Sequence, residues 1–585
     1  MAAGITERNQ HCWRCATVNP AGDKYCQGCG ASLVQRDNTT RYLCAAAQLS
    51  EDYANEAIRE FLVEPLRAIP PAPGVDTTAV LRESVAALTR RRLRDGVLLL
   101  LLTALLFTNP LVFGAWLVFG LALALLLGRS RLTARNVLIG LAVVLGVGIV
   151  LTIIGVVSFY SVLSSSGLGG SSSSGSGGLY DTAPTAPPSS SGGFLSVALI
   201  LTVIVLLLIV AVVAVDKFAE HYLVHERFSR NEFIPDGRSS RHEWERRLRG
   251  MGLAAFHLPL NRVEVAVGRV DEDVERADVV VHRGFSPFIG AGVPVYDQLI
   301  AMALEPSKKD VEPDPIDVNG LHEHVAAAID RLRATSTLGP GRRLEDLTTR
   351  EQVLLAADRL VIDHRIAPEI LADLHHAPAS QISVEQARSL ADAAVEWARY
   401  YRCYRVEAWD RDLTTSCYLH AGTDQKMLYL EWRFFALLPI APEFREIDEY
   451  RDPWLSPINA TVVELFVLPG TIVRRLASVF RRFRPLDQGL HEVVPAKYGA
   501  DRSLREFAQA DRVQSYFQDV DVKRYVRILD STLFRAVGEY LQERGYSAVE
   551  FMKLADPVVN NYNLQNTTLQ NSAIGTGNTI NTKGR

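Results

Sequence analysis

Long apolar runs occupy one part of the 585-residue chain, between positions 96 and 216. Three tracts there contain no charged residue: 97–127, which Asn109-Pro110 interrupts, 137–160 and 194–215. The second and third tracts contain 24 and 22 residues. At about 1.5 Å per residue, either could cross a hydrocarbon core of ~30 Å. The pattern therefore predicts a transmembrane region over 96–216, not the buried helices of a soluble domain.

Arginines lie on both sides of the first tract. Arg90, Arg91, Arg92 and Arg94 precede it, and Arg129, Arg131 and Arg135 follow it. Because cytoplasmic flanks are enriched in Lys and Arg, both ends should face the cytosol. Proline disfavours helix at the residue before it, so 97–128 is predicted to be a helical hairpin or a re-entrant segment. The second tract then leaves the cytosol and the third returns, which gives a multi-pass protein of the cell membrane with both termini cytosolic.

The segment 161–193 between the last two tracts is rich in Ser, Gly and Pro, and its single charge is Asp181. This composition predicts a flexible external loop. No charged residue interrupts the three tracts. Since ion paths usually place charged groups inside the bilayer, the tracts favour an anchor over a transporter or channel.

Residues 217–556 mix two hydrophobic periods and predict a cytosolic α+β domain. Strands are expected at 262–268 and 278–281, and helical periodicity dominates 344–410. A hairpin is expected from 417 to 438, with its turn at Gly422-Thr423-Asp424, and helices are expected between 504 and 553. Residues 35–95 are interpreted as a cytosolic helical linker.

The predicted cytosolic domain shows no catalytic pattern. His322-Glu323-His324 lacks the i, i+4 spacing that two histidines need to share a metal on a helix. The glycine-rich loop 284–292 lacks the lysine of a phosphate-binding loop, so a structural turn is favoured. Cys403 and Cys417 have no spaced partners and are interpreted as buried structural thiols. No catalytic or cofactor-binding residue is predicted, and an enzyme with its site in 240–555 remains the alternative.

Two Cys-x-x-Cys pairs stand in residues 8–34: Cys12 with Cys15, and Cys26 with Cys29. Four thiolates at this spacing can hold one structural Zn²⁺ tetrahedrally, and the metal would supply the folding free energy of so small a segment. Reduced or redox-active cysteines are the alternative. Zinc thiolates also need a reducing compartment, which agrees with a cytosolic N-terminus.

These residues resemble the zinc-ribbon superfamily and, more loosely, RanBP2-type fingers. Asn19 matches an asparagine of those fingers, but Gln10 stands where they have a tryptophan, and Trp13 lies inside the first pair. The resemblance implies a metal site and little about its ligand.

The segment 470–484 combines an apolar helical face with arginines, of which Arg474, Arg475, Arg481 and Arg482 are candidates for contact with a membrane surface. Basic amphipathic helices bind anionic bilayers. Packing of the apolar face into a protein core is the alternative.

The tail, 557–585, repeats apolar and asparagine positions every five residues. Such spacing predicts stacked strands with Asn and Gln ladders. It resembles the C-terminal amyloid-type signalling motifs of some bacterial membrane and immune proteins, which share the pattern at Gly575–Asn578. A disordered polar tail is the alternative.

Composition adds little to this picture. The net charge is -4, so no global charge favours nucleic acid, and the excess of arginine over lysine is typical of a GC-rich bacterial genome. We expect a membrane-anchored scaffold or signalling protein with a structural zinc module and a self-assembling tail. Its partners would be the lipid bilayer, proteins that contact the zinc ribbon and the tail, and further copies of the chain.

Overall fold

The computed structural model describes most of the ranges 38–116, 191–229, 243–263, 276–308, 312–334, 347–449, 452–480 and 494–554, with isolated positions elsewhere. The chain divides into two compact units, each built from separate stretches of sequence. Unit 1 comprises 1–90, 222–450 and 482–585, and unit 2 comprises 91–221 and 451–481.

Unit 1 contains a seven-stranded mixed sheet in the order β4-β9-β8-β7-β5-β3-β6. Strands β3 and β5 are parallel, and the other neighbours are antiparallel. The strands are β3 (Arg276–His282), β4 (Val293–Ala303), β5 (Leu347–Ala356), β6 (Gln381–Ser383), β7 (Ala398–Ala408), β8 (Leu413–Thr423) and β9 (Met427–Leu437).

Helices and loops cover the two faces of this sheet differently. Alternate residues of β7, β8 and β9 pack against α9 (Val318–Ala334), α13 (Tyr516–Glu543) and α14 (Val549–Leu554), as in the contact of Trp432 with Phe534. The intervening residues pack beneath the loop 284–292, where Phe288 contacts Tyr401 and Tyr418. Near the β3 end, α10 (Ala357–Ile362) and α11 (Val384–Asp392) add a smaller core. Because strand side chains alternate between faces, one strand serves two cores.

A second helical core of unit 1 begins with α1 (Asn38–Leu49) and α2 (Glu51–Ile58), which starts where Ser50 accepts a hydrogen bond from the Tyr53 backbone. The short helical segments that complete unit 1 are η1 (Arg59–Val63), η2 (Leu223–Arg227), α7 (Glu243–Ala255), η3 (Pro442–Phe444), η4 (Glu446–Asp448) and η5 (Pro495–Lys497). Residues 35–95, expected to be a linker, thus contribute to a buried core. Near the N-terminus, β1 (Gln10–His11) pairs with β2 (Val18–Asn19).

Unit 2 is built on helices. Its described part contains α3 (Thr77–Thr108) from residue 91, α6 (Ser191–Tyr222) to residue 221, and all of α12 (Leu455–Phe480). One apolar cluster joins them: Leu98, Leu101, Leu102 and Leu105 of α3 pack with Val205, Ile209 and Val213 of α6 and with Leu468 of α12. The helices therefore bury one stripe each against the others.

The predicted fold class, a hairpin and two spans beside a separate α+β domain, is wrong. Among the described residues, one helix, Leu199–Arg227, is long and apolar enough to cross a membrane. The first arm of the predicted hairpin does not begin at 97, because α3 runs without a break from Thr77 to Thr108, and most of the predicted second arm lies outside the described residues. Helix α3 is continuous across residue 97, where the polar sequence gives way to the apolar tract. The tract 137–160 and the loop up to 190 lie outside the described residues.

Some secondary-structure predictions for unit 1 are confirmed and others are wrong. The strand at 278–281, the hairpin 417–438 and the helices after 504 are confirmed. The turn of the hairpin lies at 424–426, because Gly422 and Thr423 are still paired with β9. The helical prediction for 344–410 is wrong, since this range contains β5, α10, β6, α11 and β7. The strand expected at 262–268 is also wrong where it is described, because Arg262 and Val263 are helical.

Candidate functional site

Helix α6 exposes apolar side chains over most of its circumference. Between 199 and 210 only Thr202, Val205 and Ile209 are buried, and they lie three or four residues apart on one stripe. Leu207, by contrast, is 64% exposed. The other exposed apolar residues of this segment are Leu199, Ile200, Leu201, Val203, Ile204, Leu206, Leu208 and Val210. An apolar surface of this extent is unusual for a helix in water.

The neighbouring helices extend this apolar surface. On α3 and just beyond it, Val97, Leu100, Leu106, Phe107, Leu111 and Val112 are exposed. On α12 and just before it, Trp454, Leu455, Ile458, Val463, Val467, Val473, Leu476 and Phe480 are exposed. We call these residues, with those of α6, the apolar surface of unit 2.

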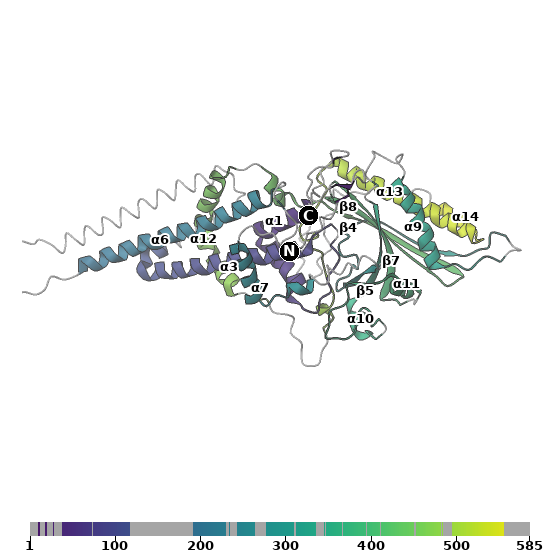
Figure 1. Cartoon of the computed structure of the whole chain (residues 1–585), viewed down its shortest axis with the longest axis horizontal. Coiled ribbons are helices and arrows are strands. Elements are labelled where there is room, and N and C mark those ends of the chain that lie inside the picture. The colour runs from purple at the N-terminus through teal and green to yellow at the C-terminus, as the bar shows by residue number, and fades with distance from the viewer. Residues whose placement is uncertain are drawn as a thin grey trace, which may run out of the picture. The chain divides into compact units, whose positions relative to one another are not determined.

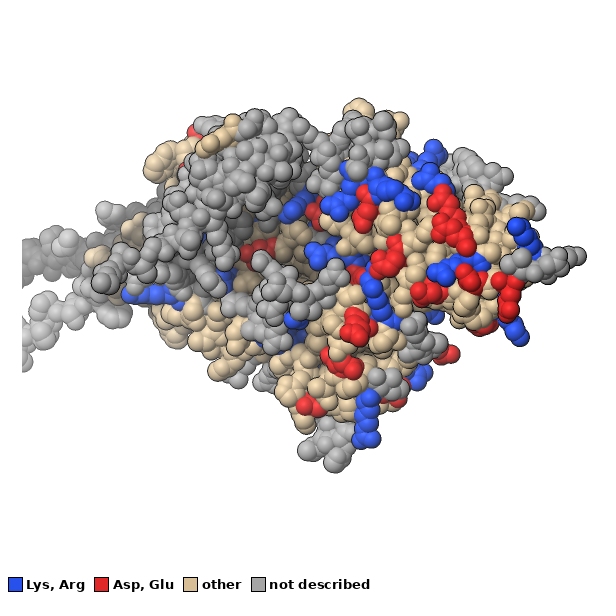
Figure 2. All heavy atoms as spheres, turned by 45° about the vertical axis from the view of Figure 1, so that its right-hand side comes forward, with Lys and Arg blue, Asp and Glu red and all other residues tan. Residues whose placement is uncertain are grey.

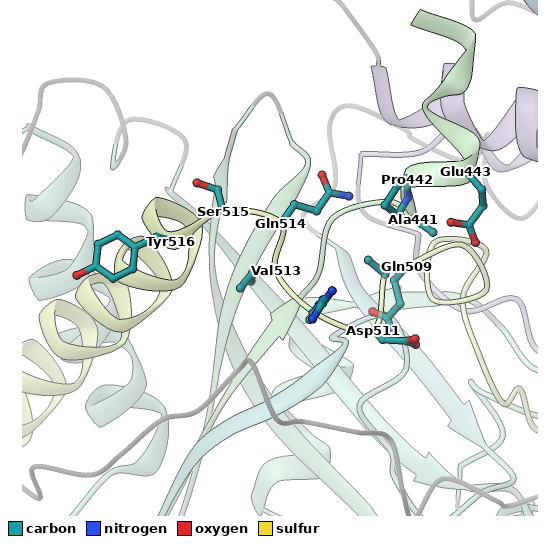
Figure 3. Close-up of a pocket in the computed structure, with 11 residues that line it drawn as sticks. Ala441, Pro442, Glu443, Gln509, Asp511, Val513, Gln514, Ser515 and Tyr516 are labelled. Carbon is teal, nitrogen blue, oxygen red and sulfur yellow. The ribbon is translucent and has the colours of Figure 1, made fainter. Parts of the chain in front are cut away.

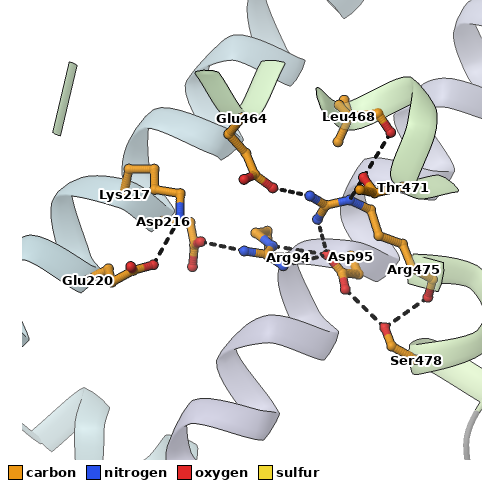
Figure 4. Close-up of polar contacts among 10 residues, drawn as sticks. All are labelled: Arg94, Asp95, Asp216, Lys217, Glu220, Glu464, Leu468, Thr471, Arg475 and Ser478. Carbon is orange, nitrogen blue, oxygen red and sulfur yellow. Dashed lines mark hydrogen bonds and ion pairs between the residues drawn. The ribbon is translucent and has the colours of Figure 1, made fainter. Parts of the chain in front are cut away.

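Charged side chains from three helices meet in a continuous ion chain at one end of the apolar cluster (Figure 4). Asp216 of α6 pairs with Arg94 of α3, with 2.8 Å between oxygen and nitrogen. Arg94 also pairs with Asp95 at 2.9 Å. Arg475 of α12 pairs with both Asp95 and Glu464, and the Ser478 hydroxyl donates to Asp95 at 3.0 Å. The order Glu464, Arg475, Asp95, Arg94, Asp216 alternates the sign of charge at each step.

The ion chain holds the helices where their apolar stripes end. Asp95 stands three residues before Leu98, and Asp216 stands three residues after Val213. The side chains of Arg475, Asp95 and Asp216 are almost fully buried. In such surroundings charges attract strongly, and a charge left without its partner is costly. None of these groups is positioned as a nucleophile or a proton donor to a substrate, so the arrangement favours a structural clamp.

Helix α12 contains Pro469 between two members of the ion chain. A straight α-helix would separate the Cα atoms of Glu464 and Arg475 by about 16 Å. Their carboxylate and guanidinium nevertheless form an ion pair, so α12 bends. Proline removes a helical hydrogen bond and crowds the preceding turn, which accounts for a bend at this position.

The predicted site residues have different outcomes. Arg475 is buried in the ion chain, whereas Arg474 is exposed, as contact with a membrane surface requires. Arg481, Arg482, the tail and all four cysteines of the predicted zinc ribbon lie outside the described residues. Sequence reasoning missed Asp95, Asp216 and Glu464. A sequence signal for two of them was present. Asp95 lies just before the first apolar tract and Asp216 just after the third, and each stands next to a basic residue, Arg94 or Lys217.

Unit 1 holds a second polar cluster between α9 and the sheet, in which Arg402 and Glu351 are almost fully buried and Glu323 is exposed. Arg402 of β7 pairs with Glu351 of β5 at 2.6 Å and with Glu323 of α9 at 3.0 Å, and Arg388 of α11 pairs with both carboxylates. Burial acts to raise the pKa of Glu351, but hydrogen bonds from Arg388 and Arg402 outweigh it and hold the pKa below its usual value. The cluster joins two helices to the sheet and does not assemble a nucleophile with a base.

The glycine-rich loop 284–292 is occupied by a side chain of the protein itself. Gly290 and Gly292 have φ values of 83° and 87°, which favour glycine. Their backbone N–H groups donate to one carboxylate oxygen of Glu506 at 3.0 and 3.2 Å, and the backbone N–H of Ser503 donates to the other at 2.7 Å. Burial raises the pKa of Glu506, and these hydrogen bonds oppose the rise. The geometry supports a structural turn.

A cavity of about 760 Å³ opens between residues 441–443 and 509–516 of unit 1. Figure 3 shows Tyr516 on the first turn of α13, away from Glu443 and Gln509. The described lining contains no histidine or cysteine, and its acidic residues are Glu443 and Asp511. On the molecular face in Figure 2, acidic and basic side chains are interspersed. The described residues of that face therefore form no single-sign patch for nucleic acid.

Comparison with known proteins gives one finding. Residues 298–581, just under half of the chain, match the family model described as an AbeC-like domain. The matched range runs from within β4 to the tail and includes α12 and α13. No curated protein and no solved structure matches the chain.

Proposed function

We propose that the protein is a membrane-anchored scaffold or signalling protein, and that α6 inserts into the bilayer. The exposed apolar circumference of α6 between 199 and 210 carries this proposal. Burying one large apolar side chain is worth about 1.5–3 kcal/mol, so a helix that leaves most of its apolar residues in water would forgo a large stabilisation. A bilayer supplies the missing apolar surroundings.

The dimensions of α6 agree with this role. Its apolar tract, 194–215, would be roughly 33 Å long as a helix, close to the ~30 Å of a hydrocarbon core. The tract is followed by Asp216 and Lys217, so the ion chain would lie near the boundary of the apolar layer. The exposed apolar residues of α3 and α12 would then adjoin the same layer through their contacts with α6.

The proposal can be tested by charge substitutions on α6. Ile204→Asp with Leu207→Asp should release much of the protein from membranes at alkaline pH, because each aspartate at the centre of a span costs about 2.5–3.5 kcal/mol. Unchanged wild-type protein and the control Ile362→Asp, an exposed apolar position of unit 1, should stay in the membrane pellet. Wild-type protein that washes off at alkaline pH would refute the anchor.

In this proposal, the N-terminal and C-terminal segments of the chain bind the partners of the scaffold. The N-terminal cysteines Cys12, Cys15, Cys26 and Cys29 would bind one structural Zn²⁺, and the tail 557–585 would associate with other copies or with partner proteins. The antiparallel pair β1 and β2, in which His11 pairs with Val18, supports the zinc module because it brackets Cys12 and Cys15.

The zinc proposal has a direct measurement. Elemental analysis of the full-length protein should find one zinc per chain, because four thiolates satisfy the tetrahedral preference of the ion. Cys12→Ser with Cys15→Ser should remove the metal, whereas Cys44→Ser, a change at a buried thiol of α1, should not. Full-length wild-type protein that carries no metal when purified under reducing conditions would contradict the proposal.

A further inference from the structure

Two buried arginines lie on the loop-covered face of the sheet in unit 1. Arg405 of β7 is 7% exposed, its Nε donates to the Ser416 hydroxyl at 3.4 Å, and its guanidinium also contacts the Tyr418 hydroxyl. Arg505, from the segment that follows η5, is 1% exposed. It donates to the Thr414 hydroxyl at 3.2 Å and to the Asp412 carbonyl at 2.6 Å. Among the described residues, neither guanidinium has a carboxylate as hydrogen-bond partner.

The register places these two guanidinium groups close together. Arg405 stands opposite Ser416 across β7 and β8, and Thr414 is two residues from Ser416 on the same strand. Residues two apart on a strand share a face and are about 7 Å apart. Two like charges are therefore held on adjacent positions of one buried surface, with only neutral oxygens bonded to them. Buried charges are normally paired with an opposite charge.

The nearest carboxylates are bound to other arginines. Glu407 pairs with Arg411 at 3.1 Å, and Asp412 pairs with Arg445. A more distant carboxylate, Asp278 on β3, accepts a hydrogen bond from Gln381 at 3.1 Å. Among the described residues, four arginines thus share the two adjacent carboxylates, which leaves an excess of positive charge there.

The site is open on one side. Across β5 and β7, Arg405 pairs with Thr348, and both Thr348 and Arg350 on that face of β5 are exposed. Arg405 keeps 7% of its surface exposed, although its guanidinium also contacts the Tyr418 hydroxyl. A small anion could therefore approach the guanidinium from the β5 side.

We infer that Arg405 and Arg505, with the hydroxyls of Ser416 and Thr414, bind a phosphate group. A phosphate dianion would neutralise both unpaired charges, and its oxygens suit the fork of the guanidinium better than a spherical anion does. The ligand class is inorganic phosphate or the phosphate monoester of a small molecule. The site requires no contact between the protein and a membrane, so it stands independently of the proposed function.

Equilibrium dialysis of the full-length detergent-solubilised protein tests the inference, with inorganic phosphate, AMP and adenosine as probes. Wild-type protein should bind phosphate, AMP or both at one site per chain and should not bind adenosine. If inorganic phosphate has the lower Kd, the ligand is free phosphate; if AMP has the lower Kd, the ligand is a phosphate monoester. Arg405→Gln should weaken that binding about tenfold or more, because it removes charge-assisted hydrogen bonds. The control Arg535→Gln, an exposed arginine of α13, should leave it unchanged.

Should Arg405→Gln fail to fold by circular dichroism, Arg405→Lys replaces it, because lysine keeps the charge and loses the fork. That variant should weaken binding severalfold. Absence of phosphate and AMP binding by folded wild-type protein would overturn the inference. So would equal affinities in the wild type and in the folded Arg405 variant.

Discussion

His322 lies on α9 and is 1% exposed, with its ring 5.1 Å from the ring of Tyr400. Arg402 donates to its backbone carbonyl at 2.9 Å, and neither ring nitrogen has a hydrogen-bond partner among the described residues. Burial, and then the charge of Arg402, lower the pKa of His322 to about 3. The imidazole therefore stays neutral in the folded protein at pH values where an exposed histidine would be protonated.

This burial predicts a dependence of stability on pH. Between pH 6.5 and about 3 the unfolded chain protonates His322 and the folded chain does not. The unfolded state then binds more protons, so the free energy of unfolding falls as the pH falls through this window. The contribution approaches 1.4 kcal/mol per pH unit. His322→Phe should reduce the loss of stability between pH 7 and 5, measured by urea unfolding.

The matched control is His375→Phe, at an exposed turn position. It should leave the pH dependence as in the wild type. A wild-type slope that survives in His322→Phe would show that other groups cause the acid sensitivity.

At the scale of elements, α12 shows what sequence patterns can and cannot resolve. The helical period and the arginines of 470–484 are visible in the sequence, and a helix is present to Phe480. The burial of Arg475 depends on Asp95, which is 380 residues away, and on a bend at Pro469. Local periodicity contains neither fact, so packing and membrane contact could not be separated from the sequence.

For the strands too, pairing between neighbouring segments can be predicted from the sequence, whereas pairing between distant segments cannot. The hairpin of β8 and β9 was predictable because its turn and both strands are contiguous. The pairing of β4 with β9 joins Val293 to Ala436 and has no local signal. In 347–361, apolar residues fit a helical face, but tertiary pairing with β3 and β7 makes most of the segment a strand.

The ion chain gives a prediction for helix packing. Arg475→Met should destabilise the protein by about 3 kcal/mol, since it leaves the buried Asp95 and the partly buried Glu464 without that partner. Adding Glu464→Met should restore a large part of the loss. Thermal unfolding in detergent measures both changes.

The neighbouring exposed arginine supplies the control for this series. Arg474→Met should change stability by no more than about 0.5 kcal/mol. Equal effects of Arg474→Met and Arg475→Met would mean that the ion chain contributes nothing specific to the packing of α12.

At the scale of the whole molecule, each unit is assembled from stretches that the sequence interleaves. Residues 451–481 belong with 91–221, although the chain between them forms most of the sheet in unit 1. Composition alone separated an apolar region from a polar one and placed α12 with the polar one. It could not show that α12 exposes apolar side chains, because exposure is set by the partners a helix packs against.

The central claim is that α6 lies in a bilayer, and labelling by a bilayer-confined carbene reagent tests it most directly. In reconstituted full-length protein, mass spectrometry should find the label on exposed positions of α6 such as Ile204 and Leu207. Buried Val205 and Ile209 should stay unlabelled, as should Phe285 of unit 1, which is 87% exposed. Label on Phe285 and none on α6 would contradict the account.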